Sequence, residues 1–341
     1  MIYPLICNFA DQANGFRVNA EESLIINGFW RSGTTWIMEL VADMLGAKTV
    51  FEPFNPPIPN RAPVKKSPIG RCLAEINPPR ADYAFVCGLM PYVDDQLDPD
   101  SQLARVVHKA LLGQLKSRKL GPKDLRECLR QRVVAKFTRG SLCLRSIQDA
   151  FGGPVLHVIR DPRASICSLK KLENGNFAWG AFNNFPLRAH LLGIQDSRTD
   201  YFSRWTQDIE MFDQASDYHR LAAYYCLTER YLLDSFRDAQ HPFHVVRFEA
   251  VGLSEAAILR QAMEQMGLPL LADQAQAFHR PSGTDWGKAN STDQVPIEER
   301  IFSWRKKLTK AECQAISEVV EHFHMTDHFW SAEKTSALMA A

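Results

Sequence analysis

Short runs of apolar residues alternate along the chain with stretches in which apolar residues recur every three or four positions. The runs at 24–29, 133–137, 155–159 and 243–248 predict β-strands. The run at 155–159 is typical of a strand that is buried on both faces of a parallel sheet. Strands that alternate with helices indicate an α/β fold, with a mainly parallel central sheet flanked by helices.

Helical spacing of apolar residues predicts a helix at 34–45, which follows the first strand after a tight turn and ends at Gly46. Further helices are predicted at 101–119, 123–131, 144–151, 163–172, 217–238, 254–266 and 310–323. Ser254 is expected to cap the N-terminus of the helix that it opens.

Two stretches do not have the spacing of a helix or a strand. Residues 51–70 contain six prolines, which predicts a surface loop, and residues 174–189 mix aromatic side chains with Asn and Gly. The length of 341 residues exceeds the roughly 250–300 residues at which single cores stop growing. We expect one domain, 1–341, with loop or helical insertions at about 53–130 and 174–240.

The near-zero net charge argues against binding of nucleic acid or of an anionic membrane through overall charge. The chain has 40 Lys plus Arg and 39 Asp plus Glu, a formal net charge of +1, so bulk charge does not hold nucleic acid or an anionic membrane. No run of apolar residues is long enough to predict a membrane span. The first residues do not resemble a secretory signal and the eight cysteines are scattered, so we expect a cytoplasmic protein.

The turn between the first predicted strand and helix is a candidate anion site. Gly28 and Gly33 have the G-x-x-x-x-G spacing of a Walker loop, whose backbone N–H groups bind phosphate at a helix N-terminus. Thr34 stands where a nucleoside triphosphatase has the lysine that reaches the β- and γ-phosphates. The nearest cation is Arg31, whose guanidinium can bind an oxyanion with two hydrogen bonds.

A second candidate anion site follows the strand at 155–159. Arg160 comes at the C-terminal end of this strand, Pro162 suits the first turn of a helix, and Ser168 lies on that helix. Ligands of open α/β sheets bind at this edge. We therefore expect Arg31 and Arg160 to face one common site.

Together these two segments resemble those of the sulfotransferase superfamily. Arg31-Ser32-Gly33-Thr34-Thr35-Trp36 is similar to its 5′-phosphosulfate loop, and Arg160-Asp161-Pro162-Arg163-Ala164 with Ser168 is similar to its 3′-phosphate motif. The resemblance implies a P-loop-like nucleotide-binding fold and the co-substrate 3′-phosphoadenosine 5′-phosphosulfate (PAPS). It places residues 31–36 at the 5′ end of PAPS, and Arg160 and Ser168 at the 3′-phosphate.

Shorter segments agree with this resemblance. Phe51-Glu52-Pro53 is similar to motifs of tyrosylprotein and Golgi carbohydrate sulfotransferases, including the spacing of the catalytic glutamate from the loop. The segment 246–249 resembles the V-x-Y-E strand, with Phe248 in place of Tyr. Segments 291–295 and 304–309 resemble S-[ST]-D-Q-V and W-x-x-x-[FL]-T. The resemblance implies that Phe248, Ser291 and Trp304 contact the co-substrate.

Sulfuryl transfer needs a base for the acceptor hydroxyl and stabilisation of charge on the leaving phosphate. Cytosolic sulfotransferases use a histidine two residues after a strand-end lysine, but Lys136 is followed at that spacing by Thr138. We therefore expect Glu52 to be the base, Arg31 to stabilise the leaving oxygen, and Lys136 to be a second cation. No metal ion is expected, and the acceptor is a hydroxyl of a small molecule, carbohydrate or peptide.

Two other functions remain open. A P-loop kinase or nucleotide hydrolase could use Asp161 as a Walker B acid, although the Walker lysine is missing. A nucleotide-binding module without turnover is the other alternative. His322, His324 and His328 lie close in sequence, but side chains two residues apart point away from each other on a helix, which argues against a metal site.

Overall fold

The computed structural model of the chain describes residues 17–54, 90–93, 96–115, 125–171, 185–194, 196–271 and 296–330. Five strands form one sheet in the order β2-β3-β1-β4-β5, and every neighbouring pair is parallel. The strands are β1 (Leu24–Gly28), β2 (Lys48–Phe51), β3 (Val133–Lys136), β4 (Val155–Ile159) and β5 (Phe243–Arg247). The predicted α/β fold with a mainly parallel central sheet is confirmed.

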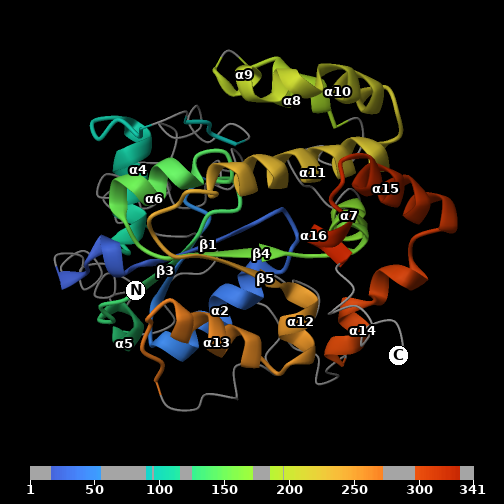
Figure 1. Cartoon of the computed structure of the whole chain (residues 1–341). Coiled ribbons are helices and arrows are strands. Elements are labelled where there is room, and N and C mark those ends of the chain that lie inside the picture. The colour runs from blue at the N-terminus through green and yellow to red at the C-terminus, as the bar shows by residue number, and fades with distance from the viewer. Residues whose placement is uncertain are drawn as a thin grey trace, which may run out of the picture.

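Helices cover both faces of the sheet (Figure 1). Helices α2 (Thr34–Leu45), α12 (Phe248–Leu253) and α13 (Ala257–Gln265) pack on one face, where they share a core with Leu24 and Ile26. Helices α4 (Gln102–Leu111), α6 (Leu144–Phe151) and α11 (Asp217–Ser235) pack on the other face, against Ile25. Successive β1 side chains therefore enter opposite cores, as the two-residue period of a strand requires.

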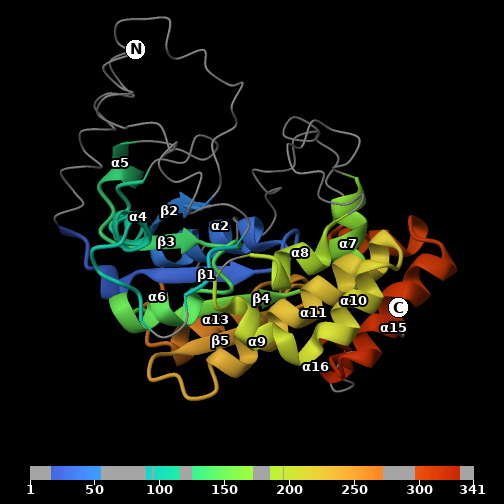
Figure 2. The same ribbon diagram turned by 90° about the horizontal axis from the view of Figure 1, so that it is seen from above.

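A third core lies beyond one end of the sheet, where α11 packs against α15. Figure 2 shows α7, α15 and α16 together at this end, with α4 and α5 at the other. Helix α15 begins with a capping box, in which Thr309 and Glu312 satisfy each other's backbone N–H groups. The remaining helices are α5 (Leu125–Cys128), α7 (Pro162–Lys170), α8 (Leu187–Leu192), α9 (Arg198–Phe202), α10 (Thr206–Asp213), α14 (Ile297–Ile301), α15 (Lys310–His322) and α16 (Thr326–Trp330). Short 3-10 turns lie at Ala20–Glu22, Ser203–Trp205 and Ser303–Lys306.

The region after β5 corrects the prediction of one helix at 254–266. The chain passes directly from β5 into α12, because Phe248 and Val251 are buried against the core that α2 shares. Ser254 is the C-cap of α12, so its prediction as an N-cap was wrong. The N-cap of α13 is Ala256, with φ of 66°.

Further differences from the predictions concern β2, α4 and α8. The edge strand β2 was not predicted, and its last residue, Phe51, had been assigned to the proline-rich loop. Helix α4 ends at Leu111 rather than near 119, because the chain turns at Gly113, whose φ is 67°. Residues 187–189 begin helix α8 rather than continuing a loop. The single-domain organisation with insertions at about 53–130 and 174–240 stays a prediction.

Within the described ranges, no helix combines the length and the apolar character that crossing a membrane requires.

Candidate active site

The parallel register brings the C-terminal ends of the strands to one edge of the sheet. Lys136 at the end of β3 lies opposite Phe51 on β2, and Gly28 at the end of β1 lies opposite Val158 on β4. The residues that follow these strands, among them Glu52, therefore gather at this edge. This is where open α/β sheets place their ligand sites.

The turn after β1 has the backbone shape of an anion cradle. The N–H of Ser32 donates to the carbonyl of Phe29 at 3.1 Å, and Gly33 is the N-cap of α2 with φ of 82°. A Cβ atom on Gly33 would lie 2.3 Å from ring atoms of Phe248. At Gly28 it would lie 2.4 Å from the carbonyl oxygen of Val158. The motif glycines are therefore required by close packing on both sides of the turn.

A buried carboxylate–ammonium pair lies beside this turn. Lys136 Nζ is 2.9 Å from Glu52 Oε1 and donates to Thr35 Oγ1 at 2.9 Å. Thr138 Oγ1 donates to the same carboxylate oxygen at 2.5 Å. Lys136 also lies over the ring of Phe51, 4.1 Å from its centroid. Both charged side chains are almost completely buried, so their charges interact in a medium of low polarity.

The pKa of Lys136 is shifted by this environment. Burial lowers the pKa of the ammonium, and the negative charge of Glu52 opposes that shift without cancelling it. The positive charge of Arg31 lowers the pKa further. The charge of Arg31, in the turn after β1, therefore acts on this pair.

The second group of residues surrounds Arg160, which follows β4. Arg160 Nη1 donates to the carbonyl oxygen of Arg31 at 3.0 Å, and Arg31 Nε donates to Ser168 Oγ at 3.0 Å. The Arg160 guanidinium lies over the ring of Phe248, 4.4 Å from the centroid, and its Nε is 3.9 Å from Glu249 Oε1. The structure thus brings Arg31, Arg160, Ser168 and Phe248 together from three different strand ends.

Burial also shifts the pKa values of the charged side chains around Arg160. It lowers the pKa of Arg160, although Glu249 acts in the opposite direction. It raises the pKa of Glu249, which Arg160 only partly offsets. Glu249 also accepts the N–H of Asp161 at 3.1 Å, so it fixes the backbone at the start of α7.

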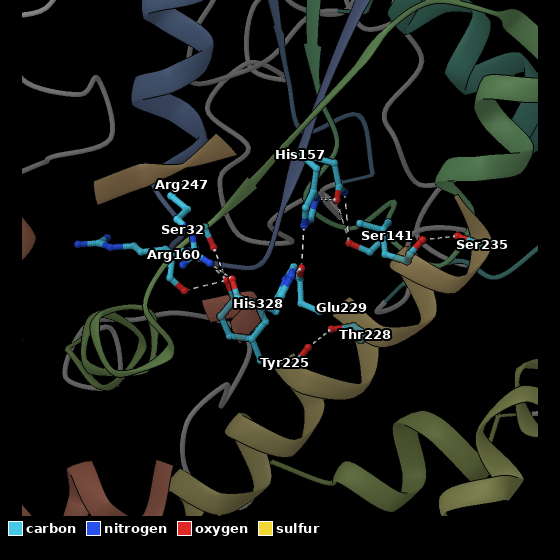
Figure 3. A network of polar contacts seen from close by, with 12 residues as sticks. Ser32, Ser141, His157, Arg160, Tyr225, Thr228, Glu229, Ser235, Arg247 and His328 are labelled. Atoms are coloured by element: carbon cyan, nitrogen blue, oxygen red, sulfur yellow. Dashed lines mark hydrogen bonds and ion pairs between the residues drawn. The ribbon is translucent and has the colours of Figure 1, made fainter. Parts of the chain in front are cut away.

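Helix α11 contributes polar residues that the sequence did not single out (Figure 3). The Tyr225 hydroxyl contacts Ser32 and the backbone of Arg160. One helical turn further on, Glu229 Oε2 lies 2.8 Å from His157 Nε2 and 3.0 Å from His328 Nε2. Burial alone would raise the pKa of Glu229, but the two histidines lower it to about 2. The spacing of a tyrosine or a glutamate along a helix does not show which distant residues it will contact. These contacts depend on the tertiary structure and could not be predicted from the sequence.

The remaining predicted residues occupy different places. Thr34 and Thr35 open α2, and Trp36 is buried in a T-shaped contact with Phe248, with 5.5 Å between the ring centroids. Trp304 is buried in the turn before α15, where the guanidinium of Arg163 lies 4.4 Å from its ring centroid. Ser291 lies outside the described residues. Contact of these residues with a nucleotide stays a prediction.

Two of the C-terminal histidines, His322 and His328, have carboxylate partners on different elements instead of a shared site. His322 Nε2 is 2.8 Å from Asp208 Oδ1, and His328 contacts Glu229. Among the residues with described positions, no group of three or more His, Cys, Asp or Glu side chains could hold a metal ion. The edge of the sheet places guanidinium and backbone N–H groups, which can bind anions, next to a carboxylate paired with an ammonium.

The sequence matches no protein-family model and no curated protein. Solved structures similar to it include a sulfotransferase domain from the curacin biosynthetic pathway, with 15% identity, a TM-score of 0.41, and coverage of 88% of this chain and 97% of that one. The sulfotransferase domain of a Synechococcus olefin synthase has 16% identity, a TM-score of 0.41, and coverage of 90% and 96%. The sulfotransferase STF1 of Mycobacterium tuberculosis has 15% identity, a TM-score of 0.37, and coverage of 86% and 81%.

Proposed function

We propose that this protein is a sulfotransferase that moves a sulfuryl group from PAPS to an acceptor hydroxyl. The observation that carries the proposal is the meeting of two arginine-bearing turns and one buried carboxylate–ammonium pair at a single edge of the sheet. Arg160 bonds directly to the backbone of Arg31. Lys136 links Thr35, on the helix that follows the Arg31 turn, to Glu52.

The residues present suit a nucleotide with phosphates at two positions. The N–H groups of the turn at 31–35 and the N-terminus of α2 suit the 5′-phosphosulfate, and Arg31 supplies the positive charge there. Arg160 and Ser168 suit the 3′-phosphate, which distinguishes PAPS from ATP. Thr34, in place of the Walker lysine, disfavours a triphosphate.

The buried pair suits the removal of a proton from the acceptor. PAPS supplies the activated sulfuryl group when it is bound, and Glu52 accepts the hydroxyl proton as the acceptor oxygen attacks. Once protonated, Glu52 no longer neutralises Lys136. The ammonium of Lys136 then stabilises the negative charge that develops on the leaving phosphate. Proton removal and charge stabilisation are thus coupled through one ion pair of 2.9 Å.

Thr138 has a supporting role in this scheme. It stands two residues after Lys136, where the resemblance predicts a histidine, and its hydroxyl donates to Glu52 instead of acting as a base. The proposed base, Glu52, and Thr138, which stands in the place of the histidine, are therefore hydrogen-bonded to each other. A hydroxyl of a small molecule, a carbohydrate or a peptide is the acceptor class that this chemistry serves.

Nucleotide binding tests the co-substrate. Thermal unfolding is measured with adenosine 3′,5′-bisphosphate, with AMP and with ATP plus Mg²⁺. A ligand present at 100 times its dissociation constant stabilises the folded protein by about 2.7 kcal/mol, which raises the unfolding temperature. We expect this increase with the bisphosphate and not with AMP or with ATP plus Mg²⁺. A response to ATP plus Mg²⁺ that exceeds the response to the bisphosphate would favour a P-loop kinase or hydrolase and would contradict the proposal.

Two arginine variants make this test specific. Arg160→Ala should remove most of the shift with the bisphosphate, because it deletes the proposed 3′-phosphate ligand. Arg237→Ala is the control, since Arg237 is exposed and pairs with Asp234 just before β5, at the opposite edge of the sheet. Equal losses in the two variants would show that general charge, rather than a defined site, holds the nucleotide.

Turnover tests the role of Glu52. Release of adenosine 3′,5′-bisphosphate from PAPS is followed with a panel of phenolic, carbohydrate and peptide hydroxyls. Glu52→Gln keeps the shape of the side chain and should lower turnover by about 10²–10⁴-fold, while affinity for the bisphosphate changes by less than about twofold. Glu318→Gln, on the exposed side of α15, is the control and should match the wild type. Tight binding without turnover of any acceptor by the wild type would instead favour a nucleotide-binding module.

A further inference from the structure

The hydroxyl of Tyr225 lies between the two anion-binding turns (Figure 3). Tyr225 is on α11, outside both turns. Its oxygen is 3.3 Å from Ser32 Oγ, 3.2 Å from the backbone N of Arg160 and 3.1 Å from the carbonyl oxygen of Arg160. One atom on a separate helix thus contacts the turn after β1 and the turn after β4.

The hydrogen bonds of this hydroxyl use its full capacity. A phenol has one proton to donate and lone pairs that accept two hydrogen bonds. Tyr225 donates its proton to the carbonyl oxygen of Arg160, and it accepts the N–H of the same residue. Because its single proton is used, Ser32 is the donor in the remaining contact. Burial raises the pKa of Tyr225 well above its ordinary value, so the hydroxyl keeps its proton over the physiological range.

The ring of Tyr225 is held independently of the hydroxyl. It stacks on Phe29 with centroids 4.0 Å apart and rings 9° from parallel, and the edge-to-face contact with Phe329 spans 4.9 Å. Tyr225 and Ser32 are both fully buried. The substitution Tyr225→Phe therefore removes one oxygen atom from between the turns and leaves the apolar contacts of the ring in place.

We infer that Tyr225 is a positioning residue that fixes the spacing between the two phosphate-binding turns, an inference that rests on the proposed function. A ligand with two phosphates gains from the second contact only if both turns are held at the spacing that the ligand requires. A ligand with one phosphate uses one turn and does not depend on that spacing. Tyr225 accordingly sets selectivity for 3′,5′-bisphosphorylated nucleotides without touching them.

The test compares three ligands by isothermal titration calorimetry. Adenosine 3′,5′-bisphosphate, adenosine 5′-monophosphate and adenosine 3′-monophosphate are titrated into the wild type and into Tyr225→Phe. We expect the variant to bind the bisphosphate about tenfold more weakly, the loss of roughly one buried hydrogen bond, and to bind each monophosphate within about twofold of the wild type. A general loss of structure would weaken all three ligands alike, so the ratio of affinities separates positioning from stability.

The neighbouring residue offers a matched control. Tyr224 is on the same helix and equally buried, but its hydroxyl has no hydrogen-bond partner among the described residues. Tyr224→Phe should leave all three affinities unchanged. An equal loss of bisphosphate affinity in the two variants, or no loss in Tyr225→Phe, would overturn the inference.

Two further outcomes keep the experiment decisive. If Tyr225→Phe does not fold, Ser32→Ala cuts the same link from the side of the turn and keeps the backbone N–H groups of the turn. Its loss of affinity should then be larger for the bisphosphate than for either monophosphate, whereas an equal loss across the three ligands would refute the positioning role. If the wild type binds the bisphosphate no better than the monophosphates, the proposed function itself fails. That result is distinct from a selective wild type whose selectivity survives in Tyr225→Phe.

Discussion

The substitution Gly33→Ala tests how tightly the turn after β1 is packed. Gly33 has φ of 82°, a left-handed conformation that costs a residue with a Cβ atom about 1 kcal/mol. The added Cβ would also lie 2.3 Å from two ring carbons of the buried Phe248. Overpacking of this kind costs about 1–3 kcal/mol, which gives a total of about 2–4 kcal/mol.

Gly267→Ala separates the two contributions. Gly267 has a similar φ of 70°, but a Cβ placed there has no atom within 4 Å. We expect this control to lose only the backbone contribution of about 1 kcal/mol. Urea denaturation of both variants measures the loss of unfolding free energy at an unchanged m-value. If Gly33→Ala loses no more than Gly267→Ala, the close approach of Phe248 to the turn is refuted.

A double variant tests whether Phe248 itself causes the cost. Phe248→Leu replaces the ring with a smaller side chain, so the loss in Gly33→Ala/Phe248→Leu should be smaller than the sum of the two single losses. The expected coupling free energy is at least about 1 kcal/mol, the size measured for side chains in contact. If the losses of unfolding free energy in the two single variants simply add in the double variant, the cost of Gly33→Ala does not come from contact with Phe248.

Two ion pairs give the remaining predictions. The pKa of Glu229 is about 2 in the folded protein and about 4.3 when unfolded, so its ionised form contributes roughly 3 kcal/mol above pH 4.3, which is lost as the pH falls toward 2. Urea denaturation between pH 2 and pH 6 should therefore show a smaller acid-dependent loss of unfolding free energy for Glu229→Gln than for the wild type, and an unchanged pH profile would contradict this. Lys136→Met removes the cation paired with the buried Glu52 and should lower the unfolding free energy by about 3–5 kcal/mol. Adding Glu52→Gln to Lys136→Met should restore a large part of this loss. Equal stability of the single and double variants would show that the pair is not energetically coupled.

The sequence identified those parts of the candidate site that depend on local pattern. Arg31 and Arg160 were found because each follows a strand that its apolar run defines and precedes a helix with a recognisable start. The meeting of Arg31 with Ser168 is a consequence of the parallel arrangement of β1 and β4. The fold class could be predicted for the same reason, since alternating strands and helices form few other arrangements.

The contacts that could not be predicted depend on the order of the strands and on helix placement. The pairing of Glu52 with Lys136 requires β2 to lie beside β3, about eighty residues further along the chain, which no local pattern specifies. Tyr225 has the spacing of an ordinary core residue of α11, and only the tertiary structure reveals where its hydroxyl lies. Helix α12 was missed because it follows β5 without the turn residues that normally separate a strand from a helix.

The strand order also determines when the site can form during synthesis. Strands β1 and β2 are consecutive in the chain but do not pair with each other, because β3, about eighty residues further on, lies between them. An emerging chain that ends before β3 has neither strand pair, so its apolar strand faces stay uncovered while the ribosome advances. Nascent chains should therefore engage chaperones until β3 has emerged.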